Sequence, residues 1–281
     1  MRRSITGKTR IYGIIGHPVE HSLSPQMQNA AFSALKIDAC YLAFSVQPED
    51  VMQAVAGLKA LNIAGINVTV PHKSAVIPLL DEISPLAKQL GAVNTIRNEQ
   101  GCLSGTNTDI SGFIRSLQDL QFSSKDKTIA LLGAGGSARA VLAGLADAGA
   151  SRILIHNRTL ERAEKLITDF APLFPAVKLE AVELETLQKT NLDLLVNTTT
   201  VGMKSGASPL DLSQCQSVLH LVDLIYSPAQ TALLKQAEEL AVPAINGLGM
   251  LLYQGCEAFT FWTGKSAPEK EMRAQLLNAI E

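Results

Sequence analysis

The 281-residue sequence has few aromatic residues and no excess of positive charge. Phe, Trp and Tyr make up only 5% of the chain, which leaves few rings on which single-stranded nucleic acid could stack. Lys and Arg total 24 against 26 Asp and Glu, a net charge of -2. Because such a chain has no basic field to attract polyanions, we expect neither nucleic acid nor a membrane as a partner.

Long hydrophobic runs and clustered cysteines are also missing. No stretch of about eighteen apolar residues occurs, so we expect no membrane span. The basic segment Met1–Lys8 is not followed by the apolar stretch of a signal peptide. Cys40, Cys102, Cys215 and Cys256 are far apart and form no CxxC pair, which argues against a disulfide framework or a zinc site. These absences predict free thiols, no metal and a cytoplasmic protein.

Hydrophobic residues make up 47% of the chain, and short apolar runs alternate with amphipathic stretches. This alternation predicts an α/β fold with mostly parallel sheets, and the length predicts two domains at roughly 150 residues each. The expected strands are Arg10–Ile15, Ala39–Ser45, Gly65–Val70, Asn94–Arg97, Lys127–Leu132, Arg152–His156, Val177–Ala181, Leu192–Val196, Val218–Asp223 and Val242–Ile245. The expected helices include Pro25–Leu35, Ile110–Leu120, Ala138–Asp147, Leu160–Asp169, Thr231–Leu240, Met250–Thr263 and Pro268–Ile280.

A glycine-rich turn lies between a predicted strand and a predicted helix in Ile129–Ala140. It fits GxGxxG/A, with Gly133 allowing the tight turn, Gly135 allowing close approach of a pyrophosphate, and Ala138 allowing the helix to pack on the strand. The free N–H groups and the helix dipole would hold the phosphates. Glycine turns also serve packing alone, but the flanking strand and helix favour a dinucleotide site.

The residues after the next strand favour NADP over NAD. An NAD-binding unit usually has Asp or Glu there to bind the ribose hydroxyls. This chain has Arg158 instead, with Arg162 one helical turn later, and a guanidinium suits a 2′-phosphate. The alternative is that both arginines belong to a solvated helix face.

The first third of the chain has polar clusters where predicted strands end. Ser22 and Ser24 could present two hydroxyls to an anion or a polyol, and Ser24 could also cap a helix that has Pro25 at its first position. His17 and His21 have a helical metal-ligand spacing, but Pro18 makes a helix there improbable.

Three further clusters follow: Asn67–Lys73, Asn94-Thr95 and Gly105–Asp109. Asp109 could simply be an acidic residue at a helix N-terminus. Together the clusters supply hydroxyls, amides, one ammonium and one carboxylate. That lining suits a small polyhydroxylated carboxylic acid.

The chain resembles the shikimate dehydrogenase family over nearly its whole length. The motifs that carry the resemblance occur in the family's order: Gly16–Asn29, Asn67–Lys73, Gly91–Thr95, Gly105–Asp109, Gly133–Ala140, Asn157–Thr159, Asn197–Met203, Asp223–Pro228 and Asn246–Gln254. One departure is Gln28, where the family often has His in Ser-Pro-x-Met-His-Asn.

The resemblance implies reversible, NADPH-dependent reduction of 3-dehydroshikimate to shikimate, a step of chorismate and aromatic amino-acid biosynthesis. It also implies two domains with the active site in the cleft between them. Residues 1–110 and 247–281 would form the substrate-binding domain, with the C-terminal helices returning to it. Residues 111–246 would form a Rossmann-type NADP-binding domain. The oligomeric state is left as monomer or homodimer.

The resemblance also assigns site residues. Lys73 and Asp109 would be the catalytic pair, and an ammonium at Lys73 could both stabilise and protonate the carbonyl oxygen that hydride transfer makes negative. The substrate-binding set would be Ser22, Ser24, Thr69, Lys73, Asn94, Asp109, Tyr226 and Gln254. The cofactor-binding set would be Gly133, Ala134, Gly135, Gly136, Ser137, Ala138, Asn157, Arg158, Thr159, Arg162, Thr198, Thr199, Thr200 and Gly247.

Three alternatives stay open at this point. The nearest is a quinate/shikimate dehydrogenase that uses NAD, with the same chemistry. A second is a catalytically silent NADP-binding regulator, against which Lys73 and Asp109 argue. A third is a methylene-tetrahydrofolate-type dehydrogenase, although the hydroxyl-rich clusters favour a compact polyol over a pterin.

Overall fold

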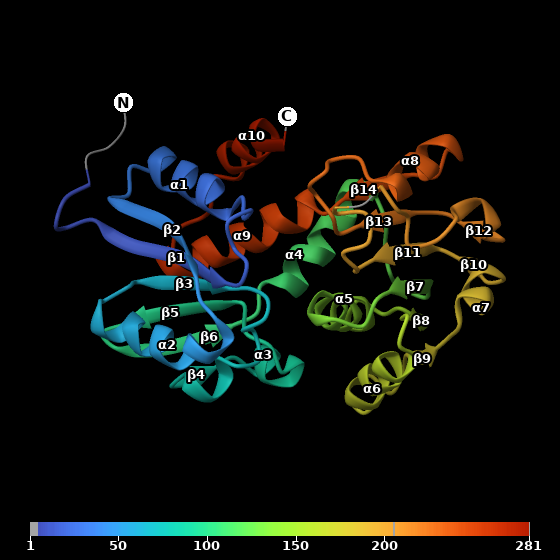
Figure 1. Ribbon diagram of the computed structural model, residues 1–281, viewed down its shortest axis with the longest axis horizontal. Helices are drawn as coiled ribbons and strands as arrows, with labels where there is room; N and C mark the ends of the chain where they lie inside the picture. Colours follow the sequence, from blue (N-terminus) through green and yellow to red (C-terminus); the bar gives the residue numbers. More distant parts are fainter. Residues whose placement is uncertain (1–4, 205, 281) are drawn as a thin grey trace. The chain divides into compact units, whose positions relative to one another are not determined.

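The computed structural model describes residues 5–204 and 206–280, and its chain forms two compact α/β units (Figure 1). The first unit contains the described residues through Asp109 together with Leu252–Ala279, and the second contains Ile110–Leu251 and Ile280. The chain passes between the units at the start of α4 (Asp109–Ser116) and again within α9 (Leu248–Thr263). The expected two-domain α/β class is confirmed. Met1–Ser4, part of the basic segment noted in the sequence, lie outside the described residues.

A six-stranded sheet forms the centre of the first unit, in the order β2-β1-β3-β5-β6-β4. Its strands are β1 (Arg10–Gly16), β2 (Ala39–Ser45), β3 (Gly65–Val68), β4 (Glu82–Ile83), β5 (Thr95–Glu99) and β6 (Cys102–Thr106). The pairs β1–β2, β1–β3 and β4–β6 are parallel, whereas β5 is antiparallel to both β3 and β6. As a result, the ends of β1, β3 and β6 and the start of β5 lie at one edge of the sheet.

Helices cover both faces of this sheet. They are α1 (Ser24–Ala34), α2 (Val51–Ala60), α3 (Pro85–Leu90), the second part of α9, and α10 (Glu269–Ile280). On one face Tyr12 of β1 packs on Phe32 of α1 and Trp262 of α9, with ring centroids 5.0 and 5.4 Å away. On the other face Val55 and Leu58 of α2 join a separate buried aliphatic cluster. The sheet is therefore the middle layer of three.

The second unit has a fully parallel sheet in the order β14-β13-β11-β7-β8-β9. Its strands are β7 (Thr128–Leu132), β8 (Arg152–His156), β9 (Lys178–Ala181), β11 (Leu194–Asn197), β13 (Leu221–Asp223) and β14 (Ala244–Asn246). The order is that of the doubly wound dinucleotide-binding fold, in which the crevice lies between the first and fourth strands. Here those strands are β7 and β11.

The helices of the second unit are α4, α5 (Gly136–Asp147), α6 (Leu160–Phe170), α7 (Leu184–Gln188) and α8 (Ala232–Glu239). Leu187 of α7 and Leu233 of α8 are fully buried in one leucine-rich cluster with Leu195 of β11. The described residues also form four short 3-10 helices: η1 (Pro48–Asp50), η2 (Ile77–Leu79), η3 (Leu117–Leu120) and η4 (Leu212–Gln214). No helix in the described ranges combines the length and hydropathy needed to cross a bilayer.

Two strands that the sequence predicts as continuous are each divided into two in the structure, so their predicted continuity is wrong. The run Leu192–Val196 divides into β10 (Asn191–Leu192) and β11, because Asp193 between them accepts from the backbone N–H of Thr128 at 2.9 Å. The run Val218–Asp223 divides into β12 (Ser217–Val218) and β13, and β12 pairs with β10 in a small separate sheet. The strands β4 and β6 were not expected.

Candidate functional site

The loop after β1 carries Ser22 and Ser24. Ser24 is the first residue of α1 and is buried, while Ser22 is half-buried. Leu23, and not Ser24, occupies the N-cap position, and no side chain caps the helix there. The expectation that Ser24 caps this helix is therefore wrong. The Ser24 hydroxyl is therefore not used to cap α1.

The loop after β3 carries Lys73 and is fixed on both sides of it. His72 is 1% exposed, and its Nε2 lies 2.8 Å from the backbone oxygen of Val46. The backbone oxygen of Lys73 accepts from Val93 N at 2.8 Å. Since Val93 precedes Asn94, this bond ties the lysine loop to the start of β5. The Lys73 side chain is 18% exposed, so its ammonium is shielded without being sealed from solvent.

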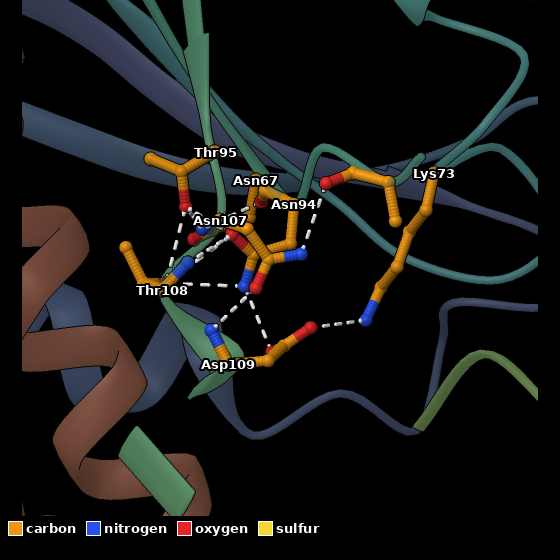
Figure 2. Close-up of polar contacts among 8 residues, drawn as sticks. Asn67, Lys73, Asn94, Thr95, Asn107, Thr108 and Asp109 are labelled. Atoms are coloured by element: carbon orange, nitrogen blue, oxygen red, sulfur yellow. Dashed lines mark hydrogen bonds and ion pairs between the residues drawn. The ribbon is translucent and has the colours of Figure 1, made fainter. Parts of the chain in front are cut away.

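Lys73 Nζ lies 2.7 Å from Oδ2 of Asp109, the first residue of α4 (Figure 2). The other carboxylate oxygen, Oδ1, accepts from Asn94 Nδ2 at 2.8 Å. The Asp109 N–H in turn donates to Asn107 Oδ1 at 2.9 Å, so the backbone that carries the carboxylate is held as well. Both oxygens accept from donor-only groups, which is the arrangement expected of an ionised carboxylate.

Thr69 and Gln254 occupy the same unit as this pair. Thr69 is half-buried, and its methyl group fills the space beside Gly16, where a Cβ would lie only 2.3 Å from it. Gln254 is half-buried on α9. The next residue, Gly255, accepts from Gln28 Nε2 at 2.9 Å. Gln28, the departure from the family pattern, therefore holds the helix that carries Gln254.

The glycine turn after β7 has open space beside two of its glycines. Gly133 has φ +105°, and a Cβ on it would lie 2.7 Å from Oγ1 of Thr198, so this position requires glycine. In contrast, a Cβ on Gly135 or Gly136 would meet nothing within 4 Å. Ala138 is fully buried where α5 starts. Free N–H groups at a helix start that face open space suit a pyrophosphate.

Two other segments lie at the same edge of the second sheet. The Thr198 hydroxyl donates to the Leu132 oxygen at 2.7 Å, which joins the loop after β11 to the glycine turn. Within that loop Thr199 Oγ1 donates to Asn197 Oδ1 at 2.7 Å. Gly247 follows β14 and is buried. The predicted residues Thr198–Thr200 therefore adjoin the predicted phosphate turn.

The loop after β8 fits a phosphorylated ribose. The strand ends at His156 without a carboxylate, and Arg158 and Arg162 are exposed at the start of α6. Asn157 Nδ2 donates to the Thr159 oxygen at 2.7 Å, which shapes the turn between them. Two exposed guanidinium groups next to an open glycine turn fit NADP better than NAD.

Tyr226 lies in the loop after β13, in the second unit, and its side chain is half-buried. Burial raises the pKa of Tyr226, so the phenol keeps its proton near neutral pH and can donate to a carboxylate. The structure thus brings Lys73, Asn94 and Asp109 into direct contact. It places Ser22 and Thr69 on loops, and Ser24 at the start of α1, at the same edge of the sheet.

Several buried residues behind this contact were not predicted as site residues. Thr108 N donates to Asn94 Oδ1 at 2.8 Å, and Thr95 Oγ1 donates to the same oxygen at 2.9 Å. The pattern Asn107-Thr108-Asp109 before a helix is a usable signal, because Asn two residues before a helix start often bonds to the backbone. Across the ranges 5–204 and 206–280, no three His, Cys, Asp or Glu side chains are grouped to hold a metal ion.

Three family descriptions match the chain in consecutive segments. Residues 14–96 match the shikimate dehydrogenase substrate binding domain. Residues 116–205 match shikimate / quinate 5-dehydrogenase, and residues 247–277 match the shikimate 5′-dehydrogenase C-terminal domain. The matched segments contain the loops of Ser22 and Lys73, the glycine turn and the loop of Arg158, whereas Asp109 and Tyr226 lie between matched segments.

Similar proteins cover almost the full length. A shikimate dehydrogenase (NADP(+)) of Geobacter metallireducens is 47% identical over 283 residues, with 99% of each chain covered. The crystal structure of shikimate dehydrogenase from Aquifex aeolicus has a TM-score of 0.90 at 42% identity, covering 97% of this chain and 99% of that one. Shikimate 5-dehydrogenase from Thermus thermophilus, in complex with NADP(H) and shikimate, has a TM-score of 0.87 at 34% identity, covering 96% and 100%.

Proposed function

The chain belongs to the shikimate dehydrogenase family, and we propose that it catalyses the reversible, NADP-dependent reduction of 3-dehydroshikimate to shikimate. The observation that carries the proposal is the contact of Lys73 Nζ with Asp109 Oδ2 at 2.7 Å, at the edge of the sheet where Ser22, Ser24 and Thr69 also lie. An ammonium, a carboxylate and several neutral donors at one edge suit a small hydroxylated acid.

The substrate groups have distinct partners in this proposal. Ser22 and Ser24 bind the carboxylate through their hydroxyls, with the protonated phenol of Tyr226 as a third donor. Thr69, Lys73, Asn94, Asp109 and Gln254 bind the ring oxygens. Neutral donors suit the carboxylate because they add no charge that would compete with the Lys73–Asp109 pair.

Lys73 moves the proton of the reaction. During ketone reduction the carbonyl oxygen gains negative charge, and an ammonium within hydrogen-bond reach stabilises that charge and then transfers its proton to the oxygen. In the reverse direction the neutral amine accepts the proton of the alcohol. Asp109 orients the ammonium through Oδ2, and Asn94 keeps the carboxylate from turning through its bond to Oδ1. Asp109 and Asn94 therefore keep the Lys73 side chain in position while its amine loses and regains the proton.

The second unit supplies the cofactor-binding residues. Gly133, Ala134, Gly135, Gly136, Ser137 and Ala138 bind the pyrophosphate, and Asn157, Arg158, Thr159 and Arg162 bind the adenosine phosphate. Thr198, Thr199, Thr200 and Gly247 lie beside the nicotinamide half. NADPH, when bound, supplies the hydride to the ketone carbon. The alternative of an NAD-dependent quinate enzyme is not favoured, because β8 ends without a carboxylate and the close relatives use NADP.

The deciding experiment is a spectrophotometric assay of cofactor reduction with purified protein. Shikimate with NADP should give the highest kcat/KM, and quinate or NAD should lower it strongly. Equal turnover of shikimate and quinate, or of NADP and NAD, would point to the alternative enzyme. A protein that binds NADP but turns over neither substrate would be the silent regulator.

We also propose that the enzyme works in the cytoplasm as a monomer or a homodimer. Cys40, Cys102, Cys215 and Cys256 are all free thiols, which is typical of proteins from a reducing compartment. Light scattering on the purified protein measures its mass and separates the two oligomeric states. Unchanged activity with and without a reducing agent would agree with a protein that needs no disulfide.

A further inference from the structure

A chain of buried hydrogen bonds lies behind the Lys73–Asp109 pair, and its directions are fixed by groups that can only donate or only accept. Asn94 Nδ2 donates to Asp109 Oδ1 at 2.8 Å. Asn94 Oδ1 accepts from the backbone N–H of Thr108, also at 2.8 Å. Because that N–H can only donate, the Asn94 oxygen faces Thr108 and the nitrogen faces Asp109.

Asn67 of β3 extends this chain to the next strand (Figure 2). Its Nδ2 donates to the backbone oxygen of Asn94 at 3.2 Å and to Thr95 Oγ1 at 3.1 Å. A backbone oxygen can only accept, so the nitrogen of the Asn67 amide faces β5. The Thr95 hydroxyl, occupied as an acceptor by Asn67, turns its own proton to Asn94 Oδ1 at 2.9 Å. Asn67 thus holds Asn94 at its backbone and, through Thr95, at its side chain.

Tyr41 of β2 completes the chain. Its hydroxyl lies 2.7 Å from Asn67 Oδ1, and with the amide oriented as above the phenol must be the donor. Burial raises the pKa of Tyr41 well above its ordinary value, offset in part by the neighbouring Ser24 hydroxyl, so the phenol keeps this proton. Tyr41 is 1% exposed and Asn67 is 5% exposed. With water excluded, neither group has solvent as a substitute partner.

We propose that Asn67, oriented by the Tyr41 hydroxyl, is a positioning residue for the catalytic pair. Asn67 acts through Asn94, because it keeps Asn94 Nδ2 in hydrogen-bond contact with Asp109 Oδ1. The other carboxylate oxygen, Asp109 Oδ2, then stays in contact with Lys73 Nζ. Without Asn67, the Thr95 hydroxyl can turn to Thr108 Oγ1, 3.3 Å away. The backbone at the start of β5 also loses the hydrogen bond that Asn67 donates to Asn94. The inference rests on the proposed function, since it assigns Asn67 and Tyr41 a role only through Lys73 and Asp109.

Tyr41→Phe and Asn67→Ala test the proposal, and Tyr12→Phe is a matched control. Tyr12 is also 1% exposed, lies beside Tyr41 in the β1–β2 register, and packs on the same Trp262 ring. We expect kcat/KM for shikimate to fall about 3- to 10-fold in Tyr41→Phe, which loses the hydrogen bond to Asn67 and the contact with the Ser24 hydroxyl. Asn67→Ala should lose on the order of 10- to 100-fold, because misplaced catalytic groups are costly. Tyr12→Phe should keep the original value.

A double-mutant cycle with Asp109→Ala separates positioning from a general structural effect. Once Asp109 is removed, Asn67 has no carboxylate to position, so Asn67→Ala should change kcat by less than about 2-fold in that background. Its remaining effect, through the contact of Asn94 with the substrate, should fall on KM. The proposal would be overturned if the losses in kcat of Asn67→Ala and Asp109→Ala multiply in the double variant. It would also be overturned if Tyr41→Phe has the same kcat/KM as Tyr12→Phe. If Asn67→Ala does not fold, the cycle of Tyr41→Phe with Asp109→Ala decides in the same way. Full activity of Asp109→Ala alone would instead contradict the proposed function.

Discussion

Gly247 packs directly against the backbone of Leu224, so closely that a Cβ at position 247 would lie 2.0 Å from the Leu224 oxygen. The Gly247 N–H also donates to the neighbouring Ile225 oxygen at 3.2 Å. Neither backbone segment can give way without losing its own contacts. Because Gly247 has no side chain, the two loops that follow β13 and β14 can pack directly against each other.

Gly247→Ala should lower the free energy of unfolding by about 1–3 kcal/mol, the usual cost of overpacking. Gly57→Ala is the matched control, because Gly57 lies within α2 and a Cβ on it would meet nothing within 4 Å. That variant should gain about 0.5–1 kcal/mol, since glycine weakens a helix interior. Urea titrations of the three proteins measure both effects, and equal shifts in one direction would contradict the packing argument.

Lys73→Ala should lower kcat by roughly 10²–10⁴, with a smaller effect on substrate affinity, because the variant loses the group that carries the proton. Lys59→Ala is the control, since Lys59 also pairs with an aspartate, Asp81 at 2.8 Å, but both side chains are about 40% exposed. Removing that surface pair should leave kcat unchanged. Steady-state kinetics decide: a wild-type kcat in Lys73→Ala would exclude it as the proton carrier.

Arg158→Ala should weaken NADP binding about 10- to 150-fold and spare NAD, because a charged hydrogen bond of about 1.5–3 kcal/mol to the 2′-phosphate is lost. Lys165→Ala removes the same charge from an exposed position further along α6. It should change the Kd of NADP little, which separates direct contact from the general field. Calorimetric titration measures the affinities of the original protein and of both variants for NADP and NAD. Equal losses for the two cofactors in Arg158→Ala would refute the assignment.

Local sequence predicted the strand, turn and helix around Gly133 well. The turn at Gly133, the buried Ala138 and the lack of a carboxylate after β8 are properties of single segments, so strand, turn and helix signals are enough to predict them. The contact of Lys73 with Asp109 joins residues 36 positions apart, and only the resemblance to the family indicated it.

The buried hydrogen bonds that hold Asn94 behind this contact could not be predicted from the sequence, because they depend on strand register. Asn67 meets Thr95 only because β3 and β5 pair antiparallel with these two residues opposite each other. The strand β6 was missed since its short run, Cys102–Thr106, has only one large apolar residue, Leu103. Without β6 in the sheet, nothing in the sequence places Thr108 next to Asn94.

Asp223 is fully buried and accepts its hydrogen bonds from neutral donors, and it gives stability an unusual dependence on pH. Its Oδ1 accepts from Asn197 Nδ2 at 2.9 Å and from Ile225 N at 3.2 Å, while its Oδ2 accepts from Thr231 Oγ1 at 2.6 Å. Burial raises the pKa of Asp223, and these three hydrogen bonds offset only part of that effect. The folded state therefore binds this proton more tightly than the unfolded state does.

The sign of the effect follows from linkage. A carboxyl whose folded pKa is raised stabilises the fold below its unfolded pKa of about 3.9, and that contribution is lost as the pH rises through the folded value. Asp223→Asn keeps the two bonds to Oδ1 and cannot ionise. Its stability relative to the original protein should improve as the pH rises from about 4. Asp211→Asn should show the opposite trend, and below about pH 4, because hydrogen bonds from Ser213 lower the pKa of Asp211 and its contribution is lost as the pH falls through the folded value. Urea titrations below and above about pH 4 measure both differences, and a constant difference for Asp223→Asn above that pH would show that burial does not perturb this carboxyl.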